Sequence, residues 1–170
     1  MRKPMDKTSA KLTAQFNRVH LSLRDFEEAA EYLKAYRPRR QQVIKRALLL
    51  AAIVSYACPF SNNEREVPAK ATSLLSVNLS RVLSSKELAM HQKLVNLRNE
   101  ALAHSQYTRR PLARISSSES GFAVQGRLFD LLSESIDVEV FLALCEKMKG
   151  YCTTKLFELN RVLYGVENAP

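Results

Sequence analysis

The stretch ALLLAAIVSYACPF, residues 47–60, is the most apolar part of the chain and decides how the rest can be arranged around it. Its 14 residues are fewer than the roughly 18 to 20 that a helix needs to cross a bilayer. The longer segment 39–57 is nearly all apolar after Lys45 and Arg46, which indicates a buried helix. We therefore expect the central helix of a bundle and no membrane partner.

The segment before this central helix has the periodicity of a second helix. Thr8 or Ser9 can cap its start, and YRPRR at 36–40 ends it, because a residue before proline is pushed out of helical geometry. Pro38 can then open the next helix near its first turn. The apolar seam runs in alternating steps of four and three residues through Leu12, Phe16, Val19, Leu23, Phe26, Ala30 and Leu33.

After the central helix, CPFSNNEREVP at 58–68 is typical of a loop, and 69–83 fits a short helix. Ser84 and Glu87 have the spacing of a capping box, in which the first cap residue and the third helical residue bond reciprocally. We expect the third long helix to run from about Ser85 to Ser105.

The last part of the chain contains an irregular excursion and then a long helix. ARIS at 113–116 and GFAVQ at 121–125 can pair as a small hairpin. From Asp137 the apolar spacing predicts a final helix, and Gly165 stands just past its end, where glycine is favoured.

These elements predict an all-α fold. The chain has only 4 glycines and 6 prolines among 170 residues, which favours long helices over a turn-rich β-sandwich. We expect one domain over residues 1–170, with a disordered basic start at about 1–8. Its architecture would be an up-and-down four-helix bundle with the irregular excursion between its third and fourth helices.

The charge and the cysteines restrict the partners and the compartment. A net charge of +9 and a pI near 9.7 suggest an anionic partner, either nucleic acid or an acidic protein, although solubility alone can also explain them. Cys58, Cys145 and Cys152 form no CxxC pair, which is typical of free thiols that pack inside a cytoplasmic protein. The N-terminus lacks the pattern of a signal peptide.

The stretch LVNLRNEALAHSQYTRR, residues 94–110, breaks the apolar pattern of the third long helix. On a helical wheel with Leu88 at zero, Arg98 and His91 lie at about 280° and 300°, in the middle of the apolar arc. Burying an arginine costs several kcal/mol unless an anion or hydrogen bonds compensate. A buried ion pair with a carboxylate or a snorkelling side chain would explain Arg98, and so would a functional site.

His104 lies about a third of a turn away from Arg98 on the same wheel. A regular helix would not aim both side chains at one atom. Either the last turn bends, or a symmetric dimer combines groups from two copies of the chain. A histidine at the end of a helix can also act as a cap stabilised by the helix dipole.

The segment RNEALAHS, residues 98–105, resembles the signature of the HEPN superfamily (higher eukaryote and prokaryote nucleotide-binding domains). The longer context from His91 to Ser105, and CPFSNN at 58–63, look most like its abortive-infection branch. The resemblance implies a helical bundle that dimerises and, in many members, a metal-independent endoribonuclease that serves as a toxin or antiviral effector. It therefore implies RNA as a partner, an antitoxin or other regulatory protein as a second one, and no cofactor or metal.

The same resemblance assigns roles to individual residues. Arg98 would hold the phosphate and stabilise the charge of the transition state, His104 would transfer protons, and Asn99 would orient the pair or bind phosphate. The weaker candidates for substrate binding are Ser105, Tyr107, Arg109, Arg110 and His91.

Two other functions remain open at this level. Some members of the superfamily keep the fold and act as non-catalytic modules that bind a partner protein or a nucleotide. A DNA-binding helical protein would rest on the charge alone, because no helix-turn-helix spacing supports it.

Overall fold

The structure is a computed structural model of the chain. It describes residues 7–61, 74–102, 112–118, 121–126 and 130–165. The predicted hairpin and the long helices all lie at least in part within these ranges.

Helix α1 extends over Lys7–Tyr36 and ends at the predicted YRPRR segment. The expectation that Thr8 or Ser9 caps this helix is wrong, because both residues lie inside it. The helix already includes Lys7 and Thr8, and the rest of the expected disordered start, residues 1–6, lies outside the described residues. Within the helix, the Thr13 hydroxyl donates to the Ser9 carbonyl at 2.9 Å.

Helix α2 covers Gln42–Ala57 and begins later than expected. The prediction that Pro38 opens it is wrong. The Arg39 amide donates to the Tyr36 carbonyl at 3.1 Å, which forms a turn and keeps Pro38 outside the helix. Gln41, with extended backbone angles, is the cap residue instead. A short 3-10 helix, η1, follows at Cys58–Phe60.

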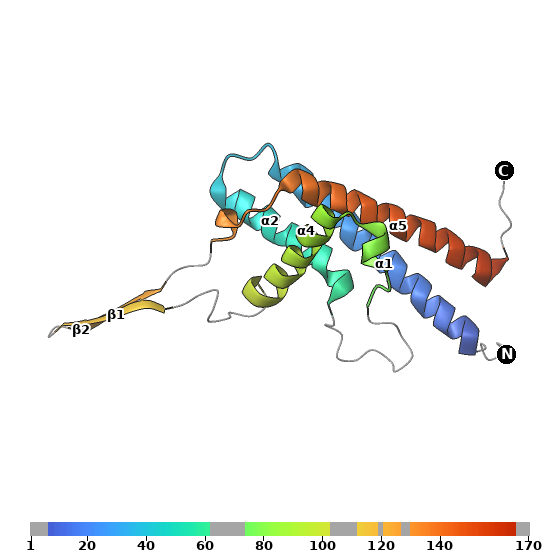
Figure 1. Ribbon diagram of the computed structural model, residues 1–170, viewed down its shortest axis with the longest axis horizontal. Coiled ribbons are helices and arrows are strands. Elements are labelled where there is room, and N and C mark those ends of the chain that lie inside the picture. The colour runs from blue at the N-terminus through green and yellow to red at the C-terminus, as the bar shows by residue number, and fades with distance from the viewer. Residues whose placement is uncertain (1–6, 62–73, 103–111, 119–120, 127–129, 166–170) are drawn as a thin grey trace.

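Helix α1 packs along α2 and along α5, which covers Val138–Tyr164. Figure 1 shows α1 and α5 side by side and running in opposite directions, with α2 crossing beside them. The predicted seam of α1 is confirmed: Val19, Phe26, Ala30 and Leu33 are buried, and the other seam residues pack against the core. The largest fully buried side chains of the core include Tyr56, Phe26, Phe141, Leu33 and Ile53.

The apolar central segment is shifted along the chain from the expected range 39–57. Together with η1, residues Gln42–Phe60 make a helix of 19 residues with mean hydropathy 1.6, which is long and apolar enough to cross a membrane by those criteria alone. The stretch 47–60 on which the expectation was based is only part of this segment, which also includes residues 42–46. In the structure the same segment contributes Leu49, Ala52 and Ile53 to the core, as the core helix of a folded domain does.

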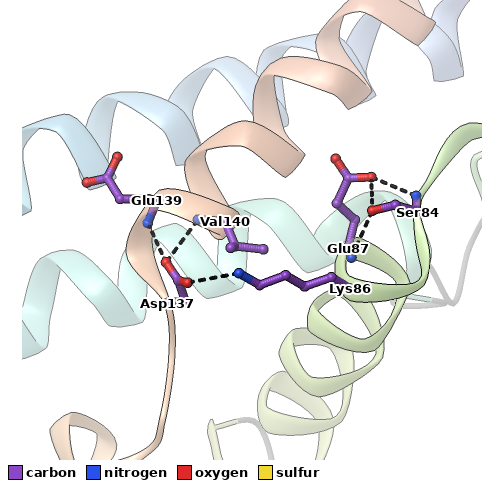
Figure 2. A network of polar contacts seen from close by, with 6 residues as sticks. All are labelled: Ser84, Lys86, Glu87, Asp137, Glu139 and Val140. Atoms are coloured by element: carbon purple, nitrogen blue, oxygen red, sulfur yellow. Dashed lines mark hydrogen bonds and ion pairs between the residues drawn. The ribbon is translucent and has the colours of Figure 1, made fainter.

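The predicted capping box at the start of α4, Ser85–Asn96, is confirmed. The Glu87 amide donates to the Ser84 hydroxyl at 3.4 Å, and the Ser84 amide donates to the Glu87 carboxylate at 2.7 Å. Figure 2 shows this box beside the start of α5, where Asp137 accepts from the amides of Glu139 and Val140. An ion pair of 3.5 Å between Lys86 and Asp137 joins the two helix starts.

The remaining elements are short. Helix α3 occupies Leu79–Val82 inside the predicted short helix, and η3 occupies Leu131–Ser133. Strands β1, Leu112–Ser118, and β2, Gly121–Gly126, pair antiparallel as predicted for ARIS and GFAVQ. Gly165 ends α5 with a φ of 62°, the left-handed conformation for which glycine is favoured.

The fold is therefore all-α, with the small hairpin as its irregular excursion between α4 and α5. The described helices share one hydrophobic core, to which α1, α2, α4 and α5 all contribute. Helix α4 is shorter and packs against α2 and α5 over less of its length than α1 does. The all-α fold is established. The regular up-and-down four-helix bundle and the single domain over 1–170 stay predictions.

Candidate functional site

Three of the predicted site residues lie within the described part of the chain. Arg98 and Asn99 belong to η2, a π-helical segment at Leu97–Leu102, and His91 belongs to α4. The other predicted site residues fall in 103–111, outside the described residues, and are His104, Ser105, Tyr107, Arg109 and Arg110.

The π-helical segment departs from the regular helix that was expected to continue to Ser105. Helix α4 ends at Asn96, and η2 continues the same chain direction with wider turns. Because π-helical bonds join residues five apart, each turn holds about one residue more than an α turn, and such turns are frequent at functional sites. The last turn before His104 is therefore distorted, which is the geometry that the first of the two sequence-based alternatives requires.

Arg98 is partly buried and has a neutral partner. Its Nη1 donates to the Oδ1 of Asn99 at 3.0 Å. No carboxylate forms an ion pair with it in the described part of the chain. The buried ion pair, the first structural explanation for an arginine in the seam, is therefore not what these residues form. Asn99 is exposed and accepts this hydrogen bond, while its predicted roles in orienting Arg98 with His104 or in binding phosphate stay predictions.

A second arginine, Arg18, lies on the same side of the fold and was missed in the sequence. Its Nη2 donates to the carbonyl of Cys58 at 3.3 Å, which joins α1 to η1. Its Nε is buried and has no hydrogen-bond partner among the described residues. Leaving such a donor unsatisfied costs about 1–3 kcal/mol, so the contacts present in the structure do not fully satisfy this side chain.

The field of both arginines reaches Cys58. Burial raises the pKa of this thiol, the charge of Asp25 raises it further, and the charges of Arg98 and Arg18 act in the opposite direction. Arg98 comes from η2, Arg18 from α1, and Cys58 from the first position of η1. Of these two cations, Arg18 contacts Cys58 directly, through the bond to its carbonyl.

Asp25 lies near the same point and has an altered ionisation. Burial raises its pKa from 3.8 to about 6, the charge of Arg18 opposes this shift, and the charge of Glu28 adds to it. A carboxyl group with this pKa is mostly ionised at pH 7 and takes up a proton as the pH falls through about 6. A cavity of about 210 Å³ on this face is lined by Arg24, Asp25, Glu27, Glu28 and Glu31.

A sequence signal for Arg18 and Asp25 did exist. They are seven residues apart, so they share a helix face, and each directly precedes a buried seam residue, Val19 or Phe26. The proximity of Arg18 to Cys58, 40 positions later, depends on tertiary packing, and no local pattern encodes it.

His91 is a core residue in this structure. Only 6% of its surface is exposed, and its Nδ1 lies 2.8 Å from the hydroxyl of Tyr56. Its ring contacts Phe60 edge-on at 4.6 Å between centroids. Burial lowers its pKa, which favours the neutral ring. The position matches the alternative of a hydrogen-bonded structural histidine, so we do not retain His91 among the substrate-binding candidates.

Cys145 and Cys152 are buried and contribute to the packing of the core. Burial raises the pKa of Cys145 and of Cys152 to about 12, and all three cysteines are free thiols, as predicted. Within the described ranges, no group of three or more His, Cys, Asp or Glu side chains is placed to hold a metal ion. A second cavity, about 340 Å³ and apolar, lies between the outer ends of α1 and α5 and is lined by Phe16, Thr153, Leu156, Phe157 and Asn160.

Comparisons of the chain with protein-family models, with curated proteins and with solved structures found no match. The site must therefore be interpreted from its own chemistry. Two guanidinium groups without described carboxylate partners, one of them set in a π turn, can bind an anion such as a phosphate.

Proposed function

We propose that this protein is a metal-independent endoribonuclease of the HEPN type, which cuts RNA by attack of the ribose 2′-hydroxyl. The observation that carries the proposal is the environment of Arg98. This cation lies in a π turn at the edge of the apolar core and is held by Asn99, without a described carboxylate to neutralise it. A fully buried structural arginine would need such a partner. Arg98 is partly exposed, as a snorkelling side chain would be, and the same exposure leaves its guanidinium free to meet a phosphate.

The proposed reaction needs only groups that this chain supplies. The 2′-oxygen attacks phosphorus and forms a new P–O bond, while the bond from phosphorus to the 5′-oxygen breaks. His104 takes the proton of the 2′-hydroxyl, and a protonated group returns one to the leaving 5′-oxygen. Arg98 stabilises the extra negative charge on the phosphoryl oxygens. The products are a 2′,3′-cyclic phosphate and a 5′-hydroxyl.

A homodimer would supply the second proton-transfer group. Two copies of His104 in one cleft could act as base and acid, as the wheel offset between Arg98 and His104 suggested. We further propose a cytoplasmic location, a role in toxin or antiviral defence, and control by an antitoxin or other regulatory protein. Candidates for guiding RNA are Ser105, Tyr107, Arg109 and Arg110.

The test is cleavage of purified RNA by wild-type protein, His104→Ala and Arg98→Ala. We expect the wild type to cut RNA, and each variant to lose about 10²-fold or more in rate while keeping wild-type helicity. Arg24→Ala is the matched control, because Arg24 is an exposed arginine of α1 that pairs with Glu27 at 2.9 Å. Cleavage unchanged in His104→Ala would exclude this mechanism. A wild-type protein that cuts no RNA but retains a specific protein partner would instead indicate the non-catalytic module.

A further inference from the structure

We propose that the exposed apolar face of α2 binds the same face of a second copy of the chain, with the two helices antiparallel. The inference names the surface that joins the homodimer, so it rests on that part of the proposed function. It does not depend on the ribonuclease chemistry, because its evidence comes from α2 and the charges beside it.

Helix α2 is apolar on the face that is turned away from the core. No charged residue occurs in 47–57, so one face of the helix buries Leu49, Ala52 and Ile53, while the other leaves apolar side chains in solvent. A helix that is apolar all round is normally buried all round. The exposed face, which we call the α2 stripe, consists of Val43, Ala47, Leu50 and Val54.

The α2 stripe has the spacing of a seam between two helices. Its steps of four, three and four residues are those by which paired helices present their apolar side chains to each other. The seam of α1 has the same alternation and is covered by the core. In the stripe, by contrast, 81% of the surface of Val43, 37% of Leu50 and 38% of Val54 are exposed. Among the described residues, the stripe is therefore a seam without a second helix.

Two copies of the stripe match when the helices run in opposite directions. In the register centred between Ala47 and Leu50, Val43 of each copy faces Val54 of the other. Ala47 of each copy then faces Leu50 of the other, and a small residue opposite a large one lets the two surfaces interdigitate. The stripe is thus complementary to itself.

Unpaired charges of opposite sign lie at the two ends of α2. Glu28 of α1 accepts from the Ser55 hydroxyl at 2.9 Å, which places it beside the last turns of α2, and Glu31 lines the same cavity as Glu28. Arg39 and Arg40 are exposed in the turn before α2. Neither these two carboxylates nor these two arginines form an ion pair within the described part of the chain. One end of α2 is therefore acidic at its flank and the other is basic.

This charge pattern favours the antiparallel pair. A two-fold axis perpendicular to the helices keeps the α1 helices of both copies on the same side of the seam. The basic turn of each copy then lies level with the acidic flank of the other, and this contact occurs twice. A parallel pair would set equal charges at the same level and gain nothing from them.

A lipid surface would fit the same region less well. Arg39 and Arg40 would suit an anionic membrane, but Glu28 and Glu31 beside the stripe would be repelled by it. A second copy satisfies both signs of charge. Because the seam is only one helix long, the interface is at the small end of specific contacts, and we expect a Kd of the order of 10 µM for the dimer.

The experiment measures the mass of the protein by sedimentation equilibrium at concentrations below and above this Kd. We expect the wild type to dimerise and Val43→Glu to do so about 100-fold more weakly, because the symmetry places two carboxylates in the seam. Val162→Glu is the matched control, since Val162 is also an exposed valine, 67% accessible, but lies on α5. It should dimerise like the wild type. Circular dichroism checks that all variants keep their helicity.

Charge reversals test the antiparallel orientation. Arg40→Glu and Glu28→Lys should each weaken dimerisation about tenfold. The protein that carries both changes should regain most of the wild-type affinity, because each pair is restored with its signs exchanged. A double variant that loses as much as the two single variants together would overturn the antiparallel pairing.

Two further results would overturn the inference. One is a wild type that stays monomeric well above the expected Kd, and the other is a Val43→Glu variant that dimerises like the wild type. A monomeric wild type that binds vesicles containing phosphatidylserine would assign the stripe to a lipid surface instead.

Failure of this inference can be distinguished from failure of the proposed function. If Val43→Glu dimerises like the wild type but His104→Ala abolishes cleavage, the ribonuclease stands and the α2 interface falls. If the wild type cuts no RNA but Val43→Glu and the charge variants change dimerisation as expected, the interface stands and the ribonuclease falls.

Discussion

The hydroxyl of Tyr56 lies 2.8 Å from the Nδ1 of His91 and joins the end of α2 to the middle of α4. Both side chains are buried, and the Tyr56 ring also meets Phe141 of α5 edge-on at 5.3 Å between centroids. The π segment that carries Arg98 begins six residues after His91. This hydrogen bond therefore fixes the helix from which the candidate site extends.

Replacing Tyr56 by Phe should test this anchor. The variant keeps the ring and leaves the Nδ1 of His91 without its partner, so we expect the free energy of unfolding to fall by about 1–2 kcal/mol. Urea unfolding followed by circular dichroism measures it. Tyr151→Phe is the matched control, because its hydroxyl donates to the Ser76 carbonyl at an exposed position. Equal losses in the two variants would show that the buried bond has no special role.

The buried imidazole of His91 should also make stability depend on pH. Burial lowers its pKa from 6.5, so the unfolded chain binds a proton more readily than the folded protein does. Stability from this group is present above pH 6.5 and is lost as pH falls through the lower, folded-state pKa. His91→Phe should lack this component when unfolding is measured from pH 7.5 downward. A variant that follows the wild-type pH profile would contradict the assignment of this effect to His91.

Asp25 should produce the opposite trend. Its folded-state pKa of about 6 is above the ordinary 3.8, so the folded protein holds the proton more tightly, and stability falls as pH rises through that interval. We expect Asp25→Asn to raise the free energy of unfolding at pH 7.5 by about 1 kcal/mol, since partial exposure reduces the effect. Glu27→Gln, at an ion-paired position of the same helix, should give no such gain. A destabilised Asp25→Asn at that pH would contradict this account.

The capping box of α4 offers a test of the predicted helix start. Glu87 accepts from the amide and hydroxyl of Ser84 and from Lys147, each at 2.7 Å, and the ion pair with Lys147 is the largest cause of the drop in its pKa to about 2. Glu87→Ala should cost about 1–2 kcal/mol in unfolding free energy. Lys147→Ala removes only the ion pair and should cost less than about 0.5 kcal/mol. Equal costs would place the stabilisation in the ion pair with Lys147 and not in the capping box, which Figure 2 shows.

Local signals in the sequence predicted the elements that local chemistry controls. The capping box at Ser84, the seam of α1 and the glycine that ends α5 were all predicted, because each depends on residues within a few positions of one another. The start of α2 was predicted wrongly. A turn between Tyr36 and Arg39 keeps Pro38 outside the helix, although proline is favoured in the first turn of a helix. Residues 58–60 were expected to begin a loop, whereas η1 continues the helical segment to Phe60.

The sequence predicted those residues of the candidate site that are neighbours along the chain, but not those brought together by tertiary packing. Arg98 and Asn99 stand out because a cation interrupts an apolar seam, and their hydrogen bond joins adjacent residues. The π-helical form of the turn could not be predicted, because helical periodicity assumes hydrogen bonds between residues four apart. Arg18 was missed because its relation to Cys58 arises from the packing of α1 against η1. His91 shared the face of Arg98 but is held by Tyr56, whose position no wheel of α4 can show.

The most direct test of the proposed ribonuclease is the chemistry of the cut ends. Purified protein is incubated with single-stranded RNA in EDTA, and the product ends are identified by mass spectrometry. The account predicts cleavage that EDTA does not inhibit, with 2′,3′-cyclic phosphate and 5′-hydroxyl ends, and its loss in His104→Ala. Cleavage that requires a divalent metal, or that leaves 5′-phosphate ends, would contradict it.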